Sequence, residues 1–147
     1  MEPYKRNIAL EWYQYGLEKG DDFFMRFMMH WVAFNWLYNS EGEDLEWDNI
    51  YKYFRRNKAR LEKYDAFSSP AIEIFMEGPV YGKNMAASKE NYEGVKQKNT
   101  YSLIKTLYCV RCNLFHGSKS LMIERDQDLV RASAVILEGY LKALLSQ

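Results

Sequence analysis

The sequence has no excess charge of either sign and few residues that interrupt helices. Twenty basic and twenty acidic side chains cancel to a formal net charge of zero. A protein that coats nucleic acid regardless of sequence needs a broad basic surface, so this balance argues against that class, although a small local anion site is compatible with it. Three prolines and eight glycines in 147 residues allow long helices.

Long apolar runs are also missing. The longest, residues 23–38, is interrupted by Arg26, His30 and Asn35, and it is too short and too polar to span a bilayer. Residues 1–5 contain no apolar signal region. We therefore expect a cytoplasmic protein without a membrane partner.

What the sequence does contain is typical of a globular chain with a core. Hydrophobic residues make up 48% and charged residues 27%, a balance that disordered chains do not reach. The length fits one domain, residues 1–147. No period-2 alternation typical of a strand is found, so we predict an all-α fold, a bundle of four to five helices. The expected helices are 4–19, 23–39, 48–64, 99–115 and 127–145, with a short one beginning at Ser69-Pro70 and ending at Gly78-Pro79.

The second of these helices is apolar nearly all round, which places it at the centre of a bundle or at an interface. Asp21 and Asp22 precede it and are good N-caps. His30 lies within it, and a satisfied core or interface histidine is favoured over a catalytic one. Asn35 is expected to be a buried polar group that bonds a neighbouring helix.

The other helices show one apolar face each. The 99–115 helix carries a stripe at i, i+4, i+7 and i+11, and the last helix is capped by Asp126. The 48–64 helix carries a solvated basic face, for which an RNA-backbone track is the alternative. Residues 39–48 are predicted to be a loop and 79–98 a long irregular connection. The expected inward residues are Ile50, Phe54, Leu61, Leu103, Leu107, Val110, Leu114, Val130, Leu137, Leu141 and Leu144.

Arg111 and His116 form the pair that could carry chemistry. A guanidinium presents a charged planar fork suited to phosphate, and an imidazole exchanges a proton near neutral pH. Together they are sufficient to break an RNA phosphodiester without a metal. Residues 94–123 contain no Asp or Glu, which favours a polyanion. Judged by spacing alone, however, such a pair is more often a surface or capping pair.

A zinc site is the competing use of the same segment. Cys109, Cys112 and His116 share a helix face at i, i+3 and i+7 and could offer three soft ligands. Structural zinc sites use four ligands, and the sequence has no second Cys/His cluster, so we favour small packed side chains. A disulfide between the two cysteines would require a distorted helix. We expect no metal and no cofactor.

The string Tyr-Cys-Val-Arg-Cys-Asn-Leu-Phe-His-Gly-Ser-Lys, residues 108–119, resembles the signature segment of the HEPN superfamily. Members of this superfamily are helical bundles with an Arg, four to six intervening residues and a His. Residues 31–38 are similar to the aromatic second helix of a subset of members. Arg125-Asp126 with the apolar residues that follow resembles their closing helix.

The resemblance implies a metal-independent endoribonuclease that leaves a 2′,3′-cyclic phosphate and a 5′-hydroxyl. Arg111 would hold the phosphate, His116 would act as acid or base, and Asn113 completes the candidate catalytic set. It also implies RNA as substrate, a role as a toxin or in phage defence, and a cognate antitoxin as a further partner. Many active members place Asn, Asp or His directly after the Arg, where this chain has Cys112. The alternative is therefore a non-catalytic HEPN-like module that binds RNA, a nucleotide or a protein partner.

Helix geometry adds an expectation about assembly. Arg111 and His116 point about 140° apart on a straight helix, so they do not converge easily within one chain. A two-fold axis beside the helix would bring both copies of each residue into one groove. We therefore predict a homodimer with the 99–116 helix at or near its interface.

Overall fold

The computed structural model describes residues 2–77, 98–115 and 124–146, and within these ranges every regular element is a helix. The predicted all-α class is confirmed. The chain divides into two compact units, which we describe separately. Unit 1 comprises residues 1–65 and 137–147, and unit 2 comprises residues 66–136.

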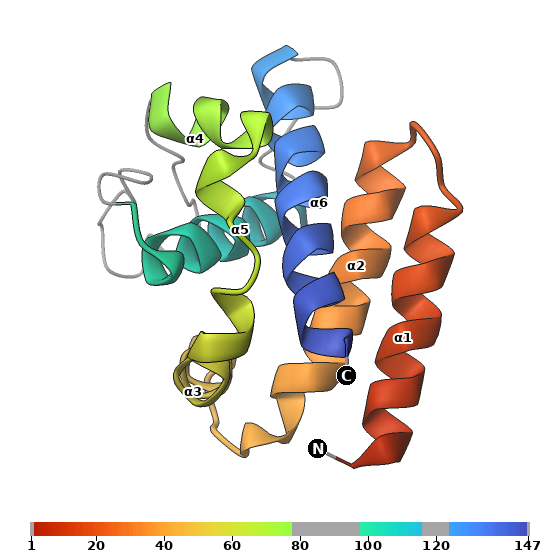
Figure 1. The fold of residues 1–147 in the computed structure, drawn as a ribbon. Coiled ribbons are helices and arrows are strands. Elements are labelled where there is room, and N and C mark those ends of the chain that lie inside the picture. Colours follow the sequence, from red (N-terminus) through yellow and green to blue (C-terminus); the bar gives the residue numbers. More distant parts are fainter. Residues whose placement is uncertain (1, 78–97, 116–123, 147) are drawn as a thin grey trace. The chain divides into compact units, whose positions relative to one another are not determined.

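Unit 1 begins with a hairpin of two helices, α1 (Pro3–Leu17) and α2 (Phe23–Tyr38), which lie side by side (Figure 1). The small residues Ala9 and Gly16 are the buried positions of α1 and allow it to approach α2 closely. Gly20 has a φ of +58°, the left-handed conformation that favours glycine. The Asp22 side chain accepts a hydrogen bond from the Met25 backbone N–H at 3.1 Å, as an N-cap does.

The third helix of unit 1, α3 (Glu46–Leu61), packs its predicted inner residues inward. Ile50, Phe54 and Leu61 are all buried. The helix is kinked at Asn57, where φ is −118°. The Asn57 side-chain amide donates to the Tyr53 carbonyl at 3.0 Å, so a local side-chain bond accompanies the break in helical geometry.

The acidic segment before α3 is tied to the basic face of that helix. A short 3-10 turn, η1 (Asn39–Glu41), lies in the predicted loop. Glu41 pairs with Arg56 at 2.8 Å and Glu43 pairs with Lys52 at 3.3 Å. Part of the positive charge of α3 is therefore already matched within unit 1.

Unit 2 contains η2 (Ala66–Ser68), η3 (Pro70–Ile72), α4 (Glu73–Glu77) and α5 (Thr100–Phe115). The predicted start at Ser69-Pro70 is confirmed, because the Ser69 hydroxyl accepts from the Ala71 backbone N–H at 3.2 Å. Leu103, Leu107 and Val110 of α5 are buried, whereas Leu114 is only half-buried. The predicted stop at Gly78-Pro79 lies outside the described residues, as do residues 79–97 of the predicted connection 79–98.

The last helix, α6 (Glu124–Leu145), starts in unit 2 and ends in unit 1. The prediction that Asp126 caps this helix is wrong, because the helix already begins at Glu124 and Asp126 lies in its first turn. An acidic side chain is favourable in both places, since each is close to the positive end of the helix dipole. The four inner residues predicted for this helix, Val130, Leu137, Leu141 and Leu144, are all buried.

In the described parts of the chain, no helix combines the length and the apolar character needed to cross a membrane.

Candidate functional site

Arg111 lies on α5, a helix without a single acidic residue. Its side chain is half-buried, and its Cζ atom lies 4.5 Å from the centroid of the Phe115 ring. Residues four apart on a helix are neighbours, so the ring is within reach of the guanidinium and holds it by a cation–π contact. One Nη1–H of Arg111 also points to the Cys112 sulfur at 3.9 Å, which is a weak contact.

The contact with Phe115 shows the direction in which Arg111 extends. Long side chains on helices usually lean toward the N-terminus. Here the guanidinium lies over the ring of a residue one turn later, toward the C-terminal end of α5. Phe115 is the last residue of α5, and His116 is the next residue in the sequence. His116 itself lies outside the described residues, so its pairing with Arg111 stays a prediction.

Three other polar or sulfur-containing side chains of the signature segment are buried in unit 2. Asn113 is 1% exposed, and Cys109 and Cys112 are buried free cysteines. A substrate that approaches α5 from solvent would therefore meet Arg111 and Phe115 before it met Asn113. Among the described residues, no group of three or more Cys, His, Asp or Glu side chains could hold a metal ion.

His30 is the centre of a buried polar cluster in unit 1. Its side chain is fully buried, and its Nε2 atom lies 2.9 Å from Oε2 of Glu138 on α6. The Arg26 guanidinium donates to the same oxygen at 2.5 Å, and the Tyr13 ring stacks on the imidazole with centroids 5.4 Å apart. The predicted core position of His30 is confirmed, but its polar satisfaction only in part, because Nε2 is hydrogen-bonded and the buried Nδ1 has no hydrogen-bond partner among the described residues. No substrate can reach an imidazole that has no exposed surface.

The cluster also changes the acidity of its members. Burial alone would raise the pKa of Glu138, but hydrogen bonds from His30 and Arg26, together with their positive charge, lower it overall. Burial, together with the nearby Glu138 carboxylate, raises the pKa of Tyr13. Glu138 is the partner that the sequence did not reveal, because it lies 108 residues after His30.

A second polar cluster in unit 1 corrects the prediction for Asn35, which is half-buried instead of buried. Its amide donates to the hydroxyl of Tyr38 on the same helix at 3.0 Å, so it does not reach a neighbouring helix directly. Trp31 donates to the same hydroxyl at 3.2 Å, and that hydroxyl donates to Glu46 of α3 at 2.7 Å. The Tyr38 hydroxyl therefore carries the link from α2 to α3.

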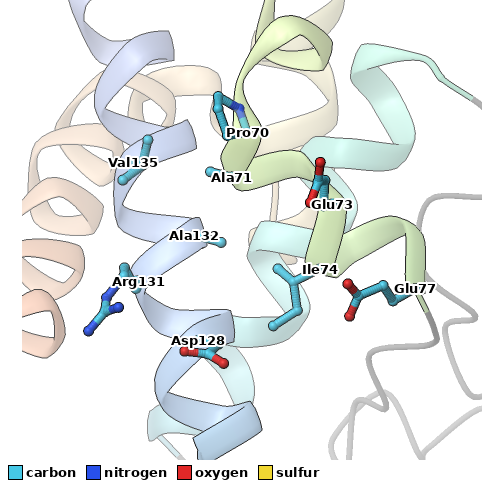
Figure 2. A pocket seen from close by; sticks show the side chains of 9 residues that line it. All are labelled: Pro70, Ala71, Glu73, Ile74, Glu77, Asp128, Arg131, Ala132 and Val135. Carbon is cyan, nitrogen blue, oxygen red and sulfur yellow. The ribbon is translucent and has the colours of Figure 1, made fainter.

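Unit 2 also contains a groove between α6 and the segment formed by η3 and α4 (Figure 2). It encloses about 320 Å³. Carboxylates of Glu73, Glu77 and Asp128 line it, and Ile74 points across it toward α6. Three carboxylates against the single guanidinium of Arg131 disfavour a polyanion, so we do not assign RNA to this groove.

Comparisons with protein-family models, with curated proteins and with solved structures give no match for this chain. A functional assignment therefore depends on the residues of the chain and on their geometry.

Proposed function

We propose that this chain is a metal-independent endoribonuclease of the HEPN type. The observation that supports the proposal best is the position of Arg111. Its guanidinium is held over Phe115 at the end of an acid-free helix, immediately before His116 in the sequence. A positive fork beside a group that exchanges protons is what phosphodiester cleavage requires.

The proposed reaction is an attack by the ribose 2′-oxygen on the adjacent phosphorus. The new P–O2′ bond forms as the P–O5′ bond breaks, which gives a 2′,3′-cyclic phosphate and a 5′-hydroxyl. The 2′-hydroxyl loses a proton and the departing 5′-oxygen gains one, and His116 serves as base or acid in this exchange. Arg111 stabilises the charge that develops on the phosphate oxygens. Asn113, which is buried, would support the helix around Arg111 and not contact the RNA.

Assembly and biology form part of the proposal. A homodimer with α5 at or near the two-fold axis would gather both copies of Arg111 and His116 in one groove. A cytoplasmic toxin or phage-defence role, with a cognate antitoxin, fits an enzyme that cleaves cellular RNA.

The test is cleavage of mixed RNA by the purified protein and three variants. Arg111→Ala and His116→Ala should each nearly abolish cleavage, since lost proton transfer alone typically costs about 10²–10⁴-fold. Lys105→Ala is the matched control, because it removes another cation from the same helix. Normal cleavage by His116→Ala, or an equal loss in Lys105→Ala, would contradict the proposal.

A non-catalytic module that binds RNA, a nucleotide or a protein partner is the second candidate. It is favoured by Cys112, which is buried directly after Arg111 where a polar residue that faces the substrate would be expected. RNA that is bound and left intact by the wild-type protein would support this candidate over the nuclease.

A further inference from the structure

Phe115 is the exposed aromatic side chain at the candidate site. Its exposed fraction is 48%, although the residue ends a helix whose other apolar side chains are largely buried. A single exposed apolar residue is ordinary on a protein surface. This one differs because the Arg111 guanidinium lies over its ring, 4.5 Å from the centroid. An aromatic surface open to solvent is thus fixed next to the group proposed to hold phosphate.

A ring and a guanidinium in this arrangement suit an unpaired nucleobase. Bases stack on aromatic side chains and on the planes of guanidinium groups, and this stacking tolerates any base because each has a π-face. In an RNA duplex both faces of a base are covered by its neighbours, and side chains cannot enter the narrow major groove. A platform beside the cleaved phosphate therefore selects RNA whose bases are free.

We propose that Phe115 stacks an unpaired base next to the phosphate held by Arg111, so that the substrate is single-stranded RNA. This inference rests on the proposed nuclease function and adds to it the class of RNA and a residue that recognises it. The contact with Arg111 gives Phe115 two roles, since the ring that stacks the base also orients the guanidinium.

The same helix contains a matched pair for comparison. Lys105 lies over the ring of Tyr101, with its Nζ atom 5.9 Å from the centroid, and Tyr101 is 36% exposed. The pair has the same four-residue spacing with the ring and the cation in reverse order, and it lies near the other end of α5, about 15 Å away along the helix axis. Tyr101→Leu therefore shows how the loss of an exposed ring elsewhere on this helix affects RNA binding.

The test is binding of a fluorescent oligonucleotide of about 12 nucleotides, with 2′-O-methyl groups throughout, to the full chain. The 2′-O-methyl group removes the nucleophile, so binding is measured without cleavage. Phe115→Leu keeps an apolar side chain and removes the ring, and it should weaken single-strand binding by about 5- to 150-fold. Phe115→Trp should bind at least as tightly as the wild type. Tyr101→Leu should stay within roughly twofold of the wild type, and Phe115→Leu should not change binding of the same sequence as a duplex.

The inference is overturned if the wild type does not bind the single strand or if Phe115→Leu binds it like the wild type. It is also overturned if the duplex or Tyr101→Leu shows the same loss. Failure of the nuclease proposal has a different outcome: ordinary RNA stays intact while the dependence of binding on Phe115 persists.

Discussion

Removal of the Glu138 carboxylate is the perturbation whose effect the structure of unit 1 predicts most fully. In Glu138→Ala, the Nε2–H of His30 loses its acceptor in a buried cluster. A buried donor left without a partner costs about 1–3 kcal/mol. The side chains of Arg26 and Glu138 are 18% and 25% exposed, so we discount their ion pair for solvent and assign it roughly 1 kcal/mol.

The expected loss in the free energy of unfolding is therefore about 2–4 kcal/mol, which lowers Tm by roughly 5–15 °C in a chain of this size. Urea denaturation followed by circular dichroism measures it. Glu11→Ala is the control, because that glutamate is exposed on α1 of the same unit. The reasoning is refuted if Glu138→Ala stays within about 0.5 kcal/mol of the wild type, as a surface substitution does.

The same contacts predict how this contribution depends on pH. The folded pKa of Glu138 lies below its ordinary value of 4.5. A group with a depressed folded pKa stabilises the protein above its unfolded pKa, and that stability is lost as the pH falls through the folded pKa. The difference in stability between the wild type and Glu138→Ala should therefore shrink as the pH falls below about pH 4.

Three further predictions test packing and assembly. Gly16→Ala places a methyl group 2.7 Å from two ring atoms of His30, so it should lower the free energy of unfolding by about 1–3 kcal/mol. Thermal melting measures this loss, and Gln14→Ala on the exposed face of α1 should leave the stability unchanged. Tyr38→Phe removes a hydroxyl that takes part in three hydrogen bonds, so urea denaturation should show a loss of about 1–3 kcal/mol in the free energy of unfolding. Tyr4 is 64% exposed, and Tyr4→Phe should cause no measurable loss. Sedimentation equilibrium should give about twice the 17.5 kDa chain mass, and a monomer at micromolar concentration would contradict the proposed dimer.

Much of the helical architecture could be predicted from local sequence. An apolar stripe placed α5, and a nearly continuous apolar segment after the cap Asp22 placed α2, each within one or two residues of its observed bounds. Local signals are less decisive at helix starts. From the sequence, Asp126 could be either an N-cap or an acidic residue in the first turn, and in the structure it lies in the first turn.

Pairings between distant segments could not be predicted. His30 was expected to be satisfied, but nothing in the sequence connects it with Glu138, because the contact arises only when α6 packs against α2. For Asn35 the prediction named the wrong kind of partner. A partner on another helix was expected, and the observed partner, Tyr38, lies three residues away on the same helix. Sequence indicates that a buried polar group needs a partner and does not identify which partner folding provides.

For the candidate site, the sequence predicted Arg111 as a candidate residue but did not predict its surroundings. The one-turn spacing between Arg111 and Phe115 was a readable signal for their contact. The burial of Asn113 could also have been expected, since it lies about 60° from Val110 on the helical wheel, close to the buried stripe.

The central claim is that the chain cleaves RNA by metal-independent attack of the 2′-hydroxyl. The most direct measurement is the identity of the new ends after incubation of mixed RNA with purified protein in excess EDTA. We predict undiminished cleavage that yields 2′,3′-cyclic phosphates and 5′-hydroxyls, with none in Arg111→Ala or His116→Ala. Intact RNA, cleavage that stops in EDTA, or 5′-phosphate ends would contradict the claim.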